Sequence, residues 1–269
     1  MMRLSIRHTT SYTYDQSGTC TVQRLRLTPV SNRWQNVLHW TVDAPGFEKA
    51  ATYVDGFGNR THLIAYSHGA ETVEITAHGI VETRDNGGVA GHLGEAASPA
   101  TFLRSTPLTD PSDEISGLAD GVLAATPLSK LHALLEAIAE QVTYVIDATN
   151  SGTSAAEAFA AGQGVCQDHA HIFIAAARRI GIPARYVTGY LHLENEEPAE
   201  ANHAWAEAWV PDLGWVGFDP ANNVCPTDRY VRLACGLDAG YAAPIVGTRR
   251  GGGNETLAVD VVVEQQQQQ

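Results

Sequence analysis

The 269-residue sequence contains few cysteines and lacks any long apolar run. Its four cysteines, Cys20, Cys166, Cys225 and Cys235, are widely spaced and form no C-x-x-C pair, which argues against a disulfide framework. No stretch approaches the roughly 20 apolar residues of a membrane-spanning helix, and the first residues hold no apolar run of signal-peptide length. We therefore expect a cytoplasmic protein with free thiols and no membrane partner.

Basic residues are also scarce, with 17 Lys and Arg against 30 Asp and Glu, so the formal net charge is -13. Such a surface would repel nucleic acid, and we expect no nucleic-acid partner. Hydrophobic residues make up 44% of the chain, which is typical of a globular protein that buries a core without covalent staples.

The chain divides into a β-rich first part and a mixed second part. Residues 1–83 contain several short segments rich in β-branched and aromatic residues, separated by polar or glycine breaks, which predicts an antiparallel sandwich or barrel. Residues 84–100 are poor in large apolar side chains and are expected to form a linker. A catalytic α+β domain is expected over 101–264, followed by a glutamine-rich tail at 265–269.

Helix signals begin after the expected linker. Asp110 and Thr126 each precede a proline, which predicts two helix starts, and Ser154 with Glu157 forms a possible capping box. A glycine-bracketed turn then leads into a helix that begins near Cys166. A strand follows that helix, and after it comes an acidic loop at 194–201. Two further strands, at 203–210 and 215–220, are expected to form a hairpin joined through Pro211–Gly214.

Cys166 is the first candidate for chemistry, because it lies where a glycine turn becomes a helix. The unpaired backbone N–H groups of a helix start would stabilise a thiolate, and the N–H of Cys166 could stabilise an oxyanion. The small residues before it, Gly164 among them, would let a substrate backbone approach closely. The alternative is a small packed hydrophobe.

His203 and Asp219 would complete a catalytic triad with Cys166. A histidine beside a thiol can take its proton and return it to a leaving group, while a carboxylate orients the ring. The alternatives are a strand-end histidine bonded to a carbonyl and a turn-forming aspartate. Pairing Val210 with Trp215 would place Asp219 opposite Ala206, about three residues out of register with His203, unless a bulge or a slightly longer loop corrects it.

Three further residues complete the expected site or its surroundings. Tyr144 is either a second oxyanion donor or a buried strand tyrosine, and Trp205 is expected to line the cleft. Cys166, His169 and His171 form a C-x2-H-x-H pattern, but on a helix these side chains fan around the axis. We therefore expect no metal, and we expect His171 to be packed and hydrogen-bonded.

Three blocks in the expected order carry a family resemblance: GQGVCQDHAH, RRIGIPARYVTGY and HAWAEAWVPDLGWVGFDPANN, within residues 162–223. They resemble the core of the bacterial transglutaminase-like superfamily. LSIRHTTSYTYDQ and DGFGNRTH are similar to the β-rich N-terminal region that accompanies this core. The resemblance implies a papain-like α+β fold, Cys166 as nucleophile, His203 as base and acid, Asp219 as orienting group, and no cofactor. The chain departs from the family's later G-R-D pattern, where it has Gly236-Leu237-Asp238.

The resemblance implies thioester chemistry on a protein, peptide or amide substrate. Water as acceptor would make the protein a cysteine protease or amidase, and we expect this outcome. An amine acceptor would make it a protein-glutamine transamidase. An arylamine-type acyltransferase and a non-catalytic binding protein with the same fold are further alternatives. All three triad candidates are present, which argues against the non-catalytic alternative.

Overall fold

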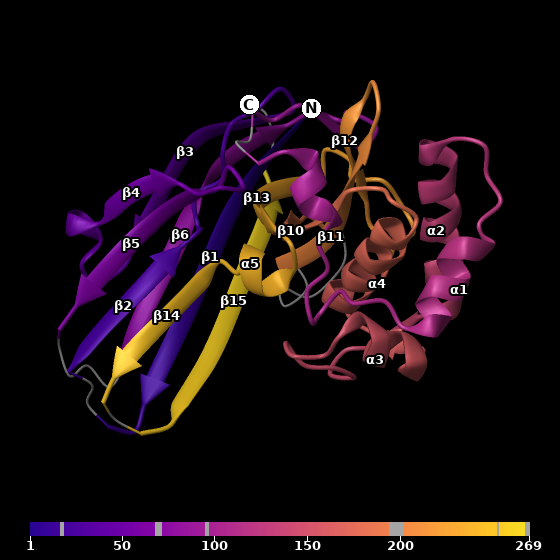
Figure 1. The fold of residues 1–269 in the computed structure, drawn as a ribbon. Helices are drawn as coiled ribbons and strands as arrows, with labels where there is room; N and C mark the ends of the chain where they lie inside the picture. Colours follow the sequence, from indigo (N-terminus) through magenta and orange to yellow (C-terminus); the bar gives the residue numbers. More distant parts are fainter. Residues whose placement is uncertain (17–18, 68–71, 95–96, 194–201, 252, 267–269) are drawn as a thin grey trace.

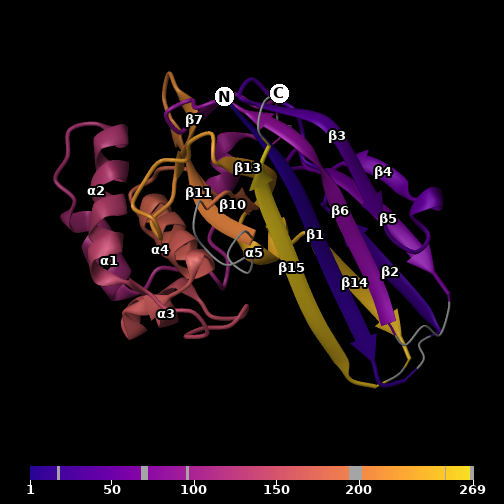
Figure 2. The same cartoon turned by 180° about the vertical axis from the view of Figure 1, so that it is seen from behind.

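The computed structural model describes residues 1–16, 19–67, 72–94, 97–193, 202–251 and 253–266. The acidic loop expected at 194–201 lies outside this described part. Figures 1 and 2 show two packed halves, a β-sandwich and a mixed half in which helices cover one face of a third sheet. None of the helices in the described ranges has the length and apolar character needed to cross a membrane.

The sandwich consists of two antiparallel four-stranded sheets. The first sheet has the order β15-β1-β6-β3, with bounds Glu255–Gln265, Met2–Tyr14, Thr72–Thr83 and Gln35–Asp43. The second has the order β14-β2-β5-β4, with bounds Ile245–Arg250, Cys20–Leu25, Arg60–Tyr66 and Ala51–Val54. Buried and more exposed side chains alternate along β1, as expected for a strand with one face against a core.

The mixed half is built on a sheet of order β13-β10-β11-β12-β7. Its strands are Tyr230–Gly236, Ala184–Leu191, Asn202–Val210, Gly214–Phe218 and Val89–Gly91. Four helices cover it: α1 Asp113–Gly121, α2 Pro127–Gln141, α3 Ala155–Ala161 and α4 Cys166–Arg179. The remaining elements are η1 Phe47–Lys49, η2 Pro99–Leu103, α5 Ala239–Ala242, and the short parallel pair β8 Thr143–Tyr144 and β9 Gln163–Gly164.

The central helix α4 is buried from Asp168 to Arg178, and its apolar side chains join those of α1, α2, β10 and β11 in one core. The expected α+β class and the β-rich N-terminal region are confirmed. Two expected helix starts, at Thr126 and Ser154, are also confirmed by their capping boxes. The start expected at Asp110 is wrong, because Ser112 caps α1 two residues later.

The residues that form each half of the structure do not coincide with the expected domain limits. Strands β14 and β15 leave the mixed half and pair with β2 and β1, so the end of the expected 101–264 unit belongs to the sandwich. The expected linker at 84–100 contains β7, which pairs with β12 at the edge of the third sheet. The sandwich core also includes Tyr190 and Val231 from that sheet, so one apolar cluster joins the two halves.

Candidate active site

The start of α4 is fixed by a carboxylate one turn into the helix. Cys166 is the first helical residue, and Val165 before it is extended. Asp168 is fully buried and accepts hydrogen bonds from the Val165 N–H at 2.8 Å and the Thr149 hydroxyl at 2.5 Å. This satisfies one of the backbone donors left unpaired at a helix start and ties Cys166 to the loop that contains Thr149.

Gly164 packs against the carboxylate that fixes the helix start. A Cβ atom at Gly164 would lie 2.7 Å from both Cβ and Oδ2 of Asp168. The absence of a side chain therefore makes room for the Asp168 carboxylate, while the close approach of a substrate backbone stays a prediction. Gly164, which lies two residues before Cys166, also pairs with Tyr144 across β8 and β9.

The structure brings His203 and Asp219 together because β11 and β12 pair in a register that differs by one residue from the predicted one. Val210 pairs with Gly214 and Ala206 with Phe218, so the hairpin loop contains only residues 211–213. Because side chains alternate with a period of two, this shift moves Asp219 to the same face as His203. The ring Nε2 of His203 lies 2.7 Å from Oδ2 of Asp219, and no bulge is needed.

The Asp219 carboxylate is held by five donors. Oδ2 accepts from the His203 ring, from the Asn222 amide at 2.8 Å and from the Tyr230 hydroxyl at 2.7 Å. Oδ1 accepts from the backbone N–H groups of Ala221 and Asn222. Burial opposes ionisation, but the His203 charge and the bonds from His203, Asn222 and Tyr230 outweigh it, so the pKa of Asp219 is lowered.

His203 is a buried imidazole with a carboxylate on one side and a thiol on the other. Since Nε2 is bonded to Asp219, the ring's Nδ1 remains for Cys166, which is a hydrogen-bonding and electrostatic partner of the ring. Burial alone would lower the pKa of His203. Asp219 and Cys166 together outweigh burial and raise that pKa to about 10. The arrangement therefore favours a protonated imidazole at neutral pH.

Trp205 lies behind the His203 ring instead of lining a cleft. Its side chain is only 1% exposed, its ring stacks on that of His203 with centroids 6.5 Å apart, and Tyr230 packs edge-on against it. Gly189 makes this possible, because a Cβ there would lie 2.8 Å from the Trp205 ring. The expectation that Trp205 contacts substrate is therefore wrong, and the indole is a buried wall of the histidine site.

The structure contradicts one alternative for Tyr144 and agrees with the prediction for His171. Tyr144 is 40% exposed, so the alternative of a buried strand tyrosine is wrong, and its ring lies 6.1 Å from that of His169. His169 contacts the carbonyl oxygens of Val165 and Val142 through its two ring nitrogens. His171 accepts a hydrogen bond from the Ala239 N–H at 3.1 Å, as expected of a packed residue.

Sequence reasoning missed two residues that hold the carboxylate. The first is Asn222, whose side-chain amide donates to Asp219 and also lies 3.4 Å from the His203 ring. The second is Tyr230, the first residue of β13, and no local pattern in the sequence indicates that it contacts Asp219. Among the described residues, no cluster of three or more His, Cys, Asp and Glu side chains is placed to hold a metal ion.

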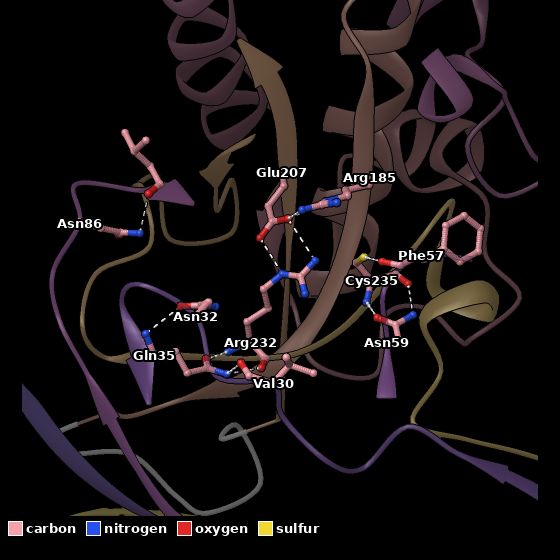
Figure 3. A network of polar contacts seen from close by, with 11 residues as sticks. Val30, Asn32, Gln35, Phe57, Asn59, Asn86, Arg185, Glu207, Arg232 and Cys235 are labelled. Atoms are coloured by element: carbon pink, nitrogen blue, oxygen red, sulfur yellow. Dashed lines mark hydrogen bonds and ion pairs between the residues drawn. The ribbon is translucent and has the colours of Figure 1, made fainter. Parts of the chain in front are cut away.

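A buried ion cluster lies on the same sheet (Figure 3). Glu207 on β11 lies 2.6 Å from the Arg185 guanidinium and 3.0 Å from that of Arg232. Burial disfavours the Glu207 charge, but the two arginines outweigh it and lower the pKa of this carboxylic acid. The Arg185 guanidinium also stacks on the Trp215 ring at 3.9 Å. The cluster therefore ties the three adjacent strands β13, β10 and β11 together.

The fold and the site together define a papain-like α+β protein in which a thiol, an imidazole and a carboxylate follow one another. The chain belongs to the transglutaminase-like superfamily. The model of that superfamily matches residues 116–220, and the model of the bacterial transglutaminase-like N-terminal region matches residues 4–82.

Similar proteins support this membership over the whole length. An uncharacterized protein of Mycobacterium leprae is 30% identical and the match covers 98% of both chains. The crystal structure of a candidate cysteine protease from Cytophaga hutchinsonii has a TM-score of 0.77 at 25% identity and covers 100% of this chain and 92% of that one. A protein-glutamine gamma-glutamyltransferase of Pseudomonas aeruginosa is 34% identical over 29% of this chain and 12% of its own.

Proposed function

We propose that this protein is a cysteine-dependent acyl-transfer enzyme that acts on amide or peptide bonds. Cys166 is the nucleophile, His203 the general base and acid, and Asp219 the group that orients the ring. The observation that carries the proposal is that the buried His203 ring lies between the Asp219 carboxylate, 2.7 Å away, and the Cys166 thiol, an arrangement that also raises the pKa of His203. A proton on the ring leaves the sulfur as a thiolate, which is the reactive form.

The reaction proceeds in two halves through a thioester. The Cys166 sulfur forms a bond to the substrate carbonyl carbon, the C–N bond breaks, and His203 gives its proton to the leaving amine or ammonia. A water molecule then gives a proton to His203 and attacks the thioester carbon. The C–S bond breaks, the acid leaves, and the protonated ring again faces a thiolate.

The negative oxygen formed in each half needs hydrogen-bond donors. The backbone N–H of Cys166, in the first turn of α4, is the first donor that we propose. Tyr144 is the second, since β8 runs beside Gly164 and leaves the side chain partly exposed.

We favour water as the acceptor, which makes the enzyme a protease or amidase with a protein or peptide substrate in the cytoplasm. The similarity to the candidate cysteine protease extends over the whole chain and supports this choice. Transamidation of protein glutamines is the alternative, and the shorter similarity to the gamma-glutamyltransferase of Pseudomonas aeruginosa supports it. A non-catalytic binding protein would not need the raised proton affinity of His203.

A casein assay separates the alternatives. The protein is incubated with casein, with and without a fluorescent amine, and the products are followed by gel and mass spectrometry. Fragments without label mean hydrolysis, and incorporated label means transamidation. Cys166→Ser should abolish either product, whereas Cys225→Ser, at another partly exposed free cysteine, should not. Full turnover by Cys166→Ser would refute the proposed nucleophile.

A further inference from the structure

The outer edge of the site-bearing sheet is closed by two side chains of the sandwich half (Figure 3). β13 is the edge strand, paired with β10 on one side only. Gln35, at the start of β3, donates to the Arg232 carbonyl at 2.9 Å and accepts from the Arg232 N–H at 2.7 Å. Asn59, before β5, donates to the Cys235 carbonyl and accepts from the Cys235 N–H, both at 2.8 Å.

Each of these contacts imitates a pair of backbone hydrogen bonds. A primary amide carries one acceptor and an NH₂ donor, so it can bond both groups of an edge residue as a neighbouring strand would. Gln35 and Asn59 are 1% and 2% exposed, so water cannot replace either amide easily. Buried backbone groups left unpaired would destabilise the sheet, and the two amides prevent this.

A bulge in β13 makes the double contact possible. In a regular strand, residues that point their backbone groups to the same edge are separated by an even number. Arg232 and Cys235 are three apart, and the pairing between β10 and β13 shifts register between Thr188 and Gly189. The extra residue turns both backbone pairs outward. The bulge and the two amides are therefore matched to one another.

The amides are themselves held from the sandwich half. Asp55 accepts the N–H of Asn59, its side-chain amide at 3.1 Å, and the Arg26 guanidinium at 2.8 Å. Gln35 also donates to the Val30 carbonyl. These contacts leave little freedom for either amide, so the position of β13 depends on residues of the sandwich.

The strand that the amides hold reaches the candidate active site in two places. Tyr230, two residues before Arg232, donates its hydroxyl to Asp219 at 2.7 Å. Arg232 pairs with Gly189, and Gly189 pairs with His203 on the other side of β10. A shift of β13 along its edge would therefore withdraw one donor from Asp219 and disturb the row of residues that contains His203.

We propose that Gln35 and Asn59 are positioning residues of the active site, which lock β13 in place so that Tyr230 holds the Asp219 carboxylate against His203. This inference rests on the proposed function for its catalytic meaning. It assigns the N-terminal β-rich region a direct part in the site.

Near-isosteric variants test the proposal. Asn59→Asp and Gln35→Glu each replace the NH₂ donor by a carboxylate oxygen that faces a backbone carbonyl. Asn86→Asp is the matched control, because Asn86 donates to the Val89 carbonyl at 2.8 Å near the opposite edge of the same sheet and its replacement adds the same charge. All three variants are expected to unfold at lower temperature than the wild type.

The decisive measurement is the titration of the His203 ring by NMR. We expect Asn59→Asp and Gln35→Glu to lower the pKa of His203 by about one unit, a tenfold loss of proton affinity, because a carboxylate that Tyr230 no longer holds lies farther from the ring. Tyr230→Phe should give the same shift, and adding Asn59→Asp to it should give little more. Asn86→Asp should leave the titration unchanged.

An unchanged His203 titration in both Asn59→Asp and Gln35→Glu would overturn the proposal, because the amides would then only stabilise the fold. A full second shift on top of Tyr230→Phe would also overturn it, since the effect would not pass through Tyr230. If Asn59→Asp does not fold, Asn59→Ala carries the same test without adding charge. The titration needs no turnover, so its outcome is independent of the casein assay with Cys166→Ser.

Discussion

Replacing Asp219 by asparagine keeps the shape of the side chain and removes its charge. In the wild type, Oδ2 accepts from His203, Asn222 and Tyr230, and Oδ1 accepts from two backbone N–H groups. An asparagine has one acceptor oxygen and one NH₂ donor. Whichever way the amide turns, its NH₂ faces groups that donate, so Asp219→Asn leaves buried donors without an acceptor.

The change should act most strongly on the proton of His203. Without the carboxylate, burial dominates, and we expect the pKa of His203 to fall from about 10 to below its ordinary 6.5. A fall of that size corresponds to roughly 5 kcal/mol less stabilisation of the charged ring. At neutral pH the ring would then be neutral and would no longer stabilise negative charge on the Cys166 sulfur.

Alkylation of Cys166 by iodoacetamide, followed by mass spectrometry, measures this directly. The wild type should react at a rate that changes little between about pH 6 and 9, because the His203 ring, with its pKa raised to about 10, keeps its positive charge beside the sulfur over that range. Asp219→Asn should react about tenfold more slowly for each unit below pH 8, as an ordinary thiol does. Asn222→Ala, which removes one donor and keeps the charge, should retain the flat profile. The same flat profile in Asp219→Asn would refute the proposed coupling.

Three further outcomes are expected. Gly164→Ala should lower the free energy of unfolding by about 1–3 kcal/mol in urea denaturation, because the new methyl group collides with the Asp168 carboxylate. Gly117→Ala, in α1 with open space around it, should instead be neutral or stabilising by up to about 1 kcal/mol, and equal losses at both glycines would contradict the packing argument. Glu207→Gln should cost roughly 3–5 kcal/mol in the same assay, since it removes a buried charge that lies within 3.0 Å of two guanidinium groups, and a loss below about 1 kcal/mol would argue against the ion cluster. The stability that protonated His203 contributes should be complete below about pH 6.5 and disappear as pH rises toward 10. The unfolding free energies of the wild type and His203→Gln should therefore converge over that range. A difference in unfolding free energy that does not change with pH would count against the charged ring.

Local chemistry explains which elements could be predicted from the sequence. The helix starts at Thr126 and Ser154 follow from side chains that bond the nearest backbone groups, and such signals lie within four residues. The start of α4 at Cys166 was predicted by the glycine turn before it. The expected start at Asp110 failed because Ser112 offers the same kind of cap two residues later.

Contacts between distant segments could not be predicted in the same way. The face on which Asp219 lies depends on whether a hairpin loop has three residues or four, and a single residue decides it. Tyr230 reaches Asp219 from a strand whose neighbour, β10, lies about 40 residues earlier in the sequence. Nothing in the local pattern around Gln35 or Asn59 indicates that their amides pair with β13.

The return of β14 and β15 to the sandwich orders the events of synthesis. When the ribosome has completed α5, the nascent chain already contains Cys166, His203 and Asp219, yet β1 and β2 still have open edges. Such edges are sites where chaperones or other chains can pair. Strands β14 and β15 complete the two sheets, so the sandwich closes only after these two strands have been synthesised.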